Sequence, residues 1–140
     1  MSAKVFVDTN ILVYAHDLDA GHKRQIAIEV LRHLAAERSG VLSMQVLQEF
    51  YITATRKLAA KLPRSEARGV VEDFALWCVE TSPAEIKEAF RIEDEARIGF
   101  WDALIVAAAL KGGASRILSE DLNPGQHIAG IEIENPFAAR

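Results

Sequence analysis

The sequence is poor in the residues that build disulfide frameworks and zinc sites. It contains one cysteine, Cys78, and four histidines in 140 residues. A single cysteine cannot form an internal disulfide, and no second cysteine supplies the spacing of a zinc or redox motif. None of the histidines forms the i, i+4 pair of a helical zinc site. We therefore expect Cys78 to be a core thiol and the histidines to play no part in metal binding.

The chain also lacks long apolar runs and an excess of positive charge. No run approaches the roughly 18 uncharged residues of a membrane span, and the N-terminus shows no basic region followed by an apolar stretch and a cleavage site. We therefore expect a cytoplasmic protein without membrane contacts. The formal net charge is −4, which argues against binding nucleic acid through a strong overall positive field. An acidic balance is compatible with a carboxylate cluster that binds cations.

The composition that remains is that of an ordinary globular protein. Half of the residues are hydrophobic and 26% are charged, which is too apolar for a disordered chain. A length of 140 residues suits one hydrophobic core. With no repeat, low-complexity segment or linker, we expect a single domain over residues 1–140.

Hydrophobic periodicity predicts that short strands alternate with helices. The expected strands cover 4–7, 41–42, 78–81, 116–118 and, as an edge strand, 131–134. The expected helices cover 23–37, 44 to about 61, 64–76, 83 to about 95, and 100–111. Such alternation favours right-handed βαβ units and a mostly parallel sheet covered on both faces. The expected fold class is α/β, a three-layer α/β/α sandwich.

Four acidic residues are expected near one edge of this sheet. In open parallel sheets, ligands bind beyond the carboxyl ends of the strands, where the strand order reverses. Asp8 ends the first strand, and Asp121 lies just past the strand over 116–118. Glu49 is in the second turn of the helix after strand 41–42, and Asp102 opens the buried helix "FWDALIVAAALKGG". The topology places Asp102 less directly than the others, but all four could converge.

A cluster of carboxylates is stable only when protons or cations neutralise it. Magnesium and manganese prefer carboxylate and water oxygens, so the expected chemistry is metal-assisted hydrolysis. Two such ions about 4 Å apart can activate a water and stabilise a leaving oxygen. Each acid also has an ordinary structural explanation: Asp8 or Asp102 at a helix N-terminus, Glu49 on a solvated helix face, and Asp121 in a turn. Their expected convergence carries more weight than any one position.

At these residues the chain resembles the PIN-domain nucleases, especially the VapC-like toxin ribonucleases of bacterial toxin–antitoxin systems. The similarity lies in "VFVDTNILVYA", "VLQEFY", "GFWDALIVAAAL" and "RILSEDLNPGQ" and covers essentially the whole chain. The resemblance implies a PIN-like fold, Mg²⁺ or Mn²⁺ as cofactor, an RNA substrate, a homodimer, and an antitoxin partner. It also implies catalytic and metal-binding roles for Asp8, Glu49, Asp102 and Asp121, with Thr9, Asn10 and Ser119 supporting them.

The fourth motif departs from the family pattern. Many relatives carry another Asp shortly after the fourth acid, whereas this chain has Leu122 and Asn123 there. Glu120 is adjacent, but we expect its side chain to point elsewhere. This difference leaves open whether a second metal is bound.

Other functions share some of these features. A phosphatase or phosphotransferase with an aspartyl nucleophile also places an Asp after its first strand, but usually has a second Asp where this chain has Asn10. A receiver-like signalling module needs a late conjugate lysine, and the late segment offers only Lys111. A PIN-like module that binds RNA or a partner without cleaving is a third alternative.

Nucleic-acid contacts are only weakly indicated elsewhere in the chain. The aromatic residues Trp77 and Trp101 could stack on bases, but both adjoin apolar segments, so we expect them to pack in the core. A basic group in the middle of the chain could contact RNA phosphates, although a solvated helix face is the simpler interpretation. It consists of Arg56, Lys57, Lys61, Arg64 and Arg68.

Overall fold

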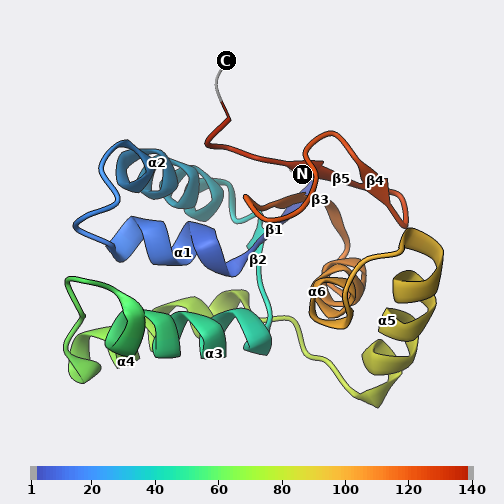
Figure 1. The fold of residues 1–140 in the computed structure, drawn as a ribbon, viewed down its shortest axis with the longest axis horizontal. Helices are drawn as coiled ribbons and strands as arrows, with labels where there is room; N and C mark the ends of the chain where they lie inside the picture. The colour runs from blue at the N-terminus through green and yellow to red at the C-terminus, as the bar shows by residue number, and fades with distance from the viewer. Residues whose placement is uncertain (1–2, 139–140) are drawn as a thin grey trace.

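The computed structural model describes residues 3–138 and shows a sheet with helices around it (Figure 1). The strands are β1 (Lys4–Val7), β2 (Gly40–Val41), β3 (Ala114–Leu118), β4 (His127–Ile128) and β5 (Ile131–Glu134). The α-helices are α1 (Thr9–His16), α2 (His22–Glu37), α3 (Met44–Ile52), α4 (Arg64–Phe74), α5 (Pro83–Ala96) and α6 (Phe100–Lys111). A π-helical segment, η1 (Thr53–Lys57), follows α3, and a 3₁₀ turn, η2 (Ala75–Trp77), follows α4.

The sheet has the order β2-β1-β3-β5-β4 and is parallel except for β4. Helices α1 and α2 lie on one side of it, and α5 and α6 lie on the other (Figure 1). The predicted α/β class with a mostly parallel central sheet is therefore confirmed. Because β1 connects forward to β2 on one side and has β3 on the other, the strand order reverses at β1, and a crevice is expected beyond its carboxyl end.

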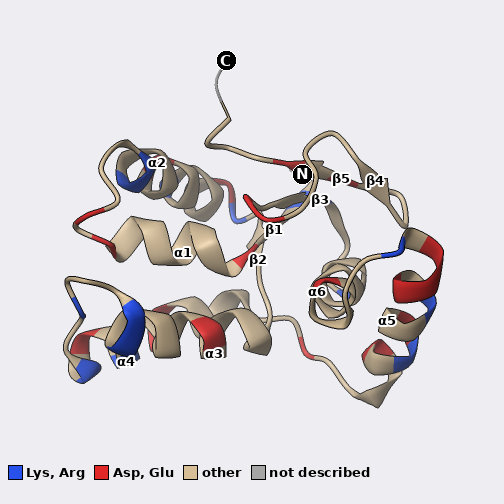
Figure 2. Cartoon of the chain, in the orientation of Figure 1, with Lys and Arg blue, Asp and Glu red and all other residues tan. Residues whose placement is uncertain are grey.

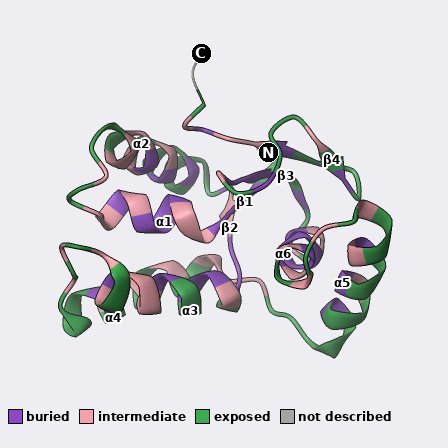
Figure 3. Ribbon diagram, in the orientation of Figure 1, coloured by how far each residue is buried: buried purple, intermediate pink, exposed green. Residues whose placement is uncertain are grey.

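The core lies between the sheet and the helices (Figure 3). Val5, Phe6 and Val7 of β1 are all buried, as expected for a central parallel strand that is covered on both faces. The twelve-residue α6 buries most of its apolar side chains against its neighbours. Over residues 3–138, no helix has the length and apolar character that crossing a membrane requires.

The strand over 131–134 is not an edge strand, contrary to the sequence-based expectation. β5 pairs with β3 on one side and with the short antiparallel β4 on the other. Ala129 and Gly130 connect β4 to β5, and both have positive φ angles. Two such residues are typical of a tight hairpin turn, which usually shows Asn-Gly or Asp-Gly in sequence. The sequence Ala129-Gly130 is not typical of such a turn, so the sequence did not predict the hairpin.

Two further expected elements are shorter than predicted. The segment over 78–81 forms only an isolated parallel bridge between Leu42 and Cys78, and Cys78 packs against the core from a half-buried position. The helix expected to reach 61 ends at Ile52 and continues as the π-helical η1. There the hydroxyl of Thr55 donates to the carbonyl of Tyr51 at 2.7 Å, a side-chain contact that bends helices.

Candidate functional site

The carboxyl ends of β1 and β3 lie side by side and bring two distant segments together. Val7 pairs with Leu118 in parallel register, and the amide of Asp8 donates to the carbonyl of Leu118 at 3.0 Å. Asp8 therefore leaves β1 beside Ser119, the first residue after β3. This is the edge at which the order of strands reverses.

Asp8 is a buried acid with only 7% of its surface exposed. It caps α1, and its Oδ1 accepts from the amide of Thr9 at 2.7 Å. Burial raises the pKa of Asp8 to about 6, and the charges of Asp121 and Glu49 add to this rise. The hydrogen bonds from Ser119 and Thr9 act in the opposite direction. Asp8 thus holds a proton far more readily than an ordinary aspartate.

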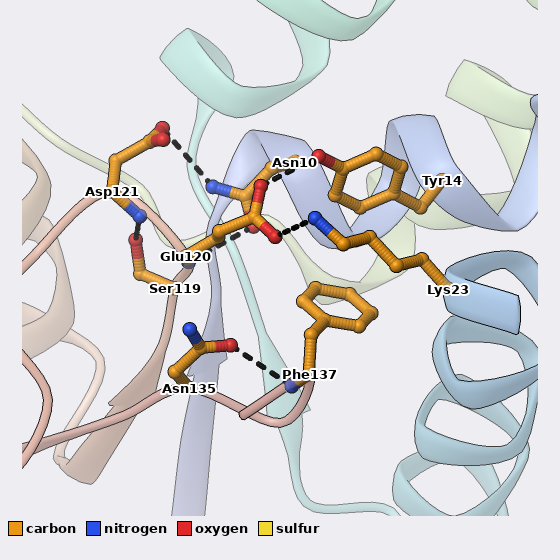
Figure 4. Close-up of polar contacts among 8 residues, drawn as sticks. All are labelled: Asn10, Tyr14, Lys23, Ser119, Glu120, Asp121, Asn135 and Phe137. Carbon is orange, nitrogen blue, oxygen red and sulfur yellow. Dashed lines mark hydrogen bonds and ion pairs between the residues drawn. The ribbon is translucent and has the colours of Figure 1, made fainter. Parts of the chain in front are cut away.

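Ser119 is fully buried and connects two of the acids. Its hydroxyl donates to Oδ2 of Asp8 at 2.7 Å. The same oxygen accepts from the amides of Asp121 at 3.1 Å and Leu122 at 3.4 Å, and Figure 4 shows the Asp121 bond. A single hydroxyl therefore fixes the turn after β3 relative to the end of β1.

The first turn of α1 supplies two more polar contacts. The side-chain amide of Asn10 donates to Oδ2 of Asp121 at 3.1 Å, and its oxygen accepts from the amide of Glu120 at 3.3 Å (Figure 4). The hydroxyl of Thr9 donates to Oε2 of Glu49 at 3.1 Å. Asn10 therefore connects α1 to the loop that follows β3, and Thr9 connects α1 to α3.

Glu49 is held from its own helix as well. Gln45, one turn earlier on α3, donates to Oε1 of Glu49 at 2.8 Å and also reaches the carbonyl of Trp101 at 3.4 Å. The two oxygens of Glu49 therefore accept from different segments. Sequence reasoning missed Gln45, although its i, i+4 spacing to Glu49 is the signal that could have identified it.

Asp102 lies in the first turn of α6 and is half-buried. Its pKa is raised by burial first, and then by the charges of Asp121 and Glu49. Those same two carboxylates act on Asp8. Asp121 and Glu49 are exposed. The four acids therefore extend from the buried Asp8, through the half-buried Asp102, to two residues that face solvent.

The four acids do not form a ready-made metal cage. Within residues 3–138, no three acidic, histidine or cysteine side chains are arranged so that they could hold a metal ion. Thr9, Asn10 and Ser119 each hold one carboxylate by a hydrogen bond. The like charges of the acids repel one another, which opposes closer approach when no cation is bound.

Glu120 points away from the other acids, as expected. Its carboxylate accepts from the hydroxyl of Tyr14 and forms an ion pair with Lys23 (Figure 4). The two positions that follow Asp121 supply no further acid, because they are Leu122 and Asn123. The Leu122 side chain is buried in the core.

The two tryptophans differ in their surroundings. Trp77 is half-buried against the core, and its ring fills the space beside Gly40. Trp101 is 66% exposed, so the expectation that it packs in the core is wrong. Trp101 immediately precedes Asp102 in the first turn of α6. It lines a cavity of about 400 Å³ with residues of α3 and α5 that include Met44 and Ile86.

The basic group belongs to η1, α4 and the segment between them, and every member is exposed. Figure 2 shows Lys and Arg on and near α4, apart from the acids at the start of α1. The guanidinium of Arg68 lies 6.0 Å from the ring centre of Tyr51. These residues form a solvated basic surface, and within residues 3–138 none of them forms an ion pair with the four acids.

Comparison with known proteins gives a consistent result. A family model described as the PIN domain matches residues 5–127, whereas no match is found among curated protein sequences. The fold is similar to that in the structure of FitAB bound to an IR36 DNA fragment, with a TM-score of 0.69, 16% identity and 97% of each chain covered. It is also similar to VapBC2 from Rickettsia felis bound to a DNA fragment from their promoter, with a TM-score of 0.61 and 18% identity. That match covers 94% of this chain and 97% of the other. The family match spans most of the sequence, and this chain belongs to the PIN domain family.

Proposed function

We propose that the protein is a divalent-metal-dependent endoribonuclease that acts as the toxin of a toxin–antitoxin pair. The observation that carries this proposal is the set of four acids at the switch point of the sheet. Burial raises the pKa of both Asp8 and Asp102, and the charges of Asp121 and Glu49 raise it further. Membership of the PIN family supports a nuclease.

The chemistry of the donor set fits Mg²⁺ or Mn²⁺. The four candidate ligands, Asp8, Glu49, Asp102 and Asp121, are all carboxylates, and hard divalent cations prefer such oxygen ligands. The repulsion between these carboxylates also favours cation binding, because a bound cation neutralises their charges.

Different polar residues of the chain would hold the different carboxylates of this site. Ser119 fixes the Asp8 carboxylate, and Thr9 and Gln45 fix the two oxygens of Glu49. Asn10 fixes Asp121. When bound, the divalent ion supplies activation of water and neutralisation of the charge that develops on the phosphodiester. These polar contacts would keep each carboxylate aimed at the site, and such supporting partners typically change metal affinity or activity by about 10- to 100-fold.

The proposed partners are those expected of a toxin of the PIN family. We take RNA as the substrate, a cognate antitoxin as the inhibitor, and a second copy of the chain as the partner in a homodimer. The similarity to the FitAB and VapBC2 assemblies supports an antitoxin partner. We further propose that the chain acts as one domain and works in the cytoplasm.

The structure supports neither the phosphatase or phosphotransferase alternative nor the receiver-like signalling module. Asn10 occupies the position of the second aspartate and bonds to the β3 loop. Lys111 ends α6, nine residues after Asp102, which at about 1.5 Å per residue places it roughly 14 Å further along the helix. It is therefore poorly placed to act as a conjugate lysine.

The test is cleavage of a mixed cellular RNA pool by metal-stripped protein, freed of any copurified inhibitor. The reaction is run with and without Mg²⁺ or Mn²⁺, beside Asp8→Asn, and every new RNA end is mapped. Metal-dependent internal cuts that Asp8→Asn lacks would support the nuclease. Absence of cuts despite measured metal binding would contradict it and favour a PIN-like module that binds without cleaving.

A further inference from the structure

Glu120 and Asp121 are adjacent in sequence but belong to different environments. Asp121 is exposed and its charge acts on Asp8 and Asp102. Both lie on the loop between β3 and β4, outside any helix or strand. Like charges push Asp121 away from the other acids. Ser119 and Asn10 hold this loop from within the site, and a contact on its other side would add to their hold against this repulsion.

Such a contact is present on the other side of the loop. The hydroxyl of Tyr14 donates to Oε1 of Glu120 at 2.5 Å, and the ammonium of Lys23 pairs with Oε2 (Figure 4). The Lys23 ammonium also lies 5.0 Å from the ring centre of Tyr14 and 5.8 Å from that of Phe137. The two rings meet edge to face at 5.1 Å. We name Tyr14, Lys23, Glu120 and Phe137 the Glu120 clamp.

The clamp ties the loop to three separate parts of the fold. Tyr14 lies on α1 and Lys23 lies on α2. Phe137 follows β5, and its amide donates to the side chain of Asn135 at 2.9 Å (Figure 4). Because these anchors come from different elements, they restrict rotation of the loop about the end of β3.

Asn10 links the clamp to the acidic site. Its oxygen accepts from the amide of Glu120, and its amide nitrogen donates to the carboxylate of Asp121. Displacing Glu120 would therefore disturb both bonds. Loss of Lys23 would in addition leave the Glu120 charge without its cation, one residue from Asp121.

We propose that Glu120, held by Lys23 and Tyr14, is a positioning residue that keeps the Asp121 carboxylate in the acidic site. The expected effect of Glu120 on metal binding rests on the proposed function. Its effect on the loop does not depend on that function. Glu120 thus acts on the site through Asn10 and the loop backbone and touches neither the metal nor the substrate.

The test compares Glu120→Gln, Lys23→Met and Tyr14→Phe with wild type, and with Lys23→Arg as a conservative replacement. Arg91→Met is the matched control, because it removes exposed ion pairs to Glu88 and Glu95 on α5. Hydrogen exchange of the 119–122 amides and Mn²⁺ affinity by titration calorimetry are measured without RNA. Cleavage is then followed as a function of Mg²⁺ concentration.

We expect Glu120→Gln and Lys23→Met to speed exchange of the loop amides and to weaken Mn²⁺ binding by about tenfold, the lower end of effects seen for supporting residues. The Mg²⁺ concentration for half-maximal cleavage should rise, and saturating Mg²⁺ should restore most of the rate. Tyr14→Phe should show a smaller change in the same direction. Lys23→Arg and Arg91→Met should match wild type.

The possible failures are distinguishable. Wild-type exchange in Glu120→Gln and Lys23→Met would overturn the clamp whether or not the protein is a nuclease. Faster exchange with unchanged Mn²⁺ affinity would overturn the positioning role and leave only a structural one. If wild type itself neither binds Mn²⁺ nor cleaves RNA, the proposed function fails, while the exchange data still decide whether Glu120 holds the loop.

Discussion

The hydroxyl of Ser119 donates to the carboxylate of Asp8 at 2.7 Å across 111 residues of sequence. This bond joins the end of β1 to the turn after β3, and the same hydroxyl accepts from the amide of Asp121. The pairing of β1 with β3 therefore sets the distance between the first and the fourth acid. Because a shift of register by one residue would turn Asp8 to the other face of the sheet, the acidic site depends on correct packing of the core strands.

Asp8→Asn should stabilise the metal-free protein above neutral pH. The pKa of Asp8 is raised from 3.8 to about 6, so the folded chain binds this proton more tightly than the unfolded chain does. Ionising Asp8 therefore costs folding free energy. The cost is absent below about pH 3.8, grows as the pH rises through 6, and reaches about 3 kcal/mol above that. Part of the gain is offset in the variant, because Asp8 accepts on two different oxygens, whereas Asn has one acceptor oxygen and carries a donor NH₂ group in place of the other.

The measurement is the free energy of unfolding by urea between pH 4 and pH 8 in the presence of a chelator. Wild type should lose stability across this range relative to Asp8→Asn. Added Mg²⁺ should recover the stability of wild type at pH 7.5 and leave the variant nearly unchanged. Parallel curves for the two proteins would contradict the raised pKa.

The end of β1 and the start of α5 were readable from the sequence because they depend on local signals. A β-branched run followed by an acid marked the end of β1, and "TSPAE" marked the capped start of α5, where Ser82 and Glu85 form a capping box. The topological rule then placed Asp8 and Asp121 at one edge of the sheet. These inferences need only periodicity, capping chemistry and right-handed crossovers.

The features that were missed depend on contacts between distant segments or on unusual backbone. The β4–β5 hairpin turns through Ala129 at a positive φ angle, which the residue type does not announce. Glu120 meets Lys23 over 97 residues of sequence, and no local pattern indicates such a pair. The exposure of Trp101 depends on what covers the first turn of α6, which an apolar sequence pattern cannot tell.

Removing either of two acids should abolish metal-dependent cleavage. We expect Asp8→Asn and Asp102→Asn each to lower the rate by more than about 100-fold, since even residues that only support metal ligands contribute about 10- to 100-fold. Circular dichroism and the melting temperature should show an intact fold. Glu72→Gln is a matched control, because Glu72 is an exposed acid of α4 that lies more than 20 residues in sequence from each of the four acids. Full activity in either Asp variant would remove these residues from the site.

Replacing Gln45 should weaken metal binding without removing a ligand. Gln45→Ala deletes the 2.8 Å bond to Glu49 and the contact with the carbonyl of Trp101. We expect the affinity for Mn²⁺ to fall by up to about tenfold, within the range for supporting residues. Gln48→Ala is the control, because it removes an exposed glutamine on the same helix. Calorimetric titration of metal-stripped protein measures both, and equal affinities for the two variants would contradict the role of Gln45.

The two tryptophans should differ sharply in their contribution to stability. Trp77 packs against Phe74 with ring centres 4.9 Å apart and fills the space beside Gly40, so Trp77→Ala leaves a cavity and should cost about 3 kcal/mol. Trp101 is 66% exposed, so Trp101→Ala should change the free energy of unfolding by less than about 0.5 kcal/mol, as is usual for surface positions. Urea unfolding at low protein concentration checks both. Gly40→Ala adds a test of the same contact, because a methyl group there would meet the Trp77 ring at 2.3 Å and should destabilise wild type more than it destabilises Trp77→Ala. A large loss in Trp101→Ala would mean that this side chain is covered in solution, and the concentration dependence of the loss would then show whether a second copy of the chain covers it.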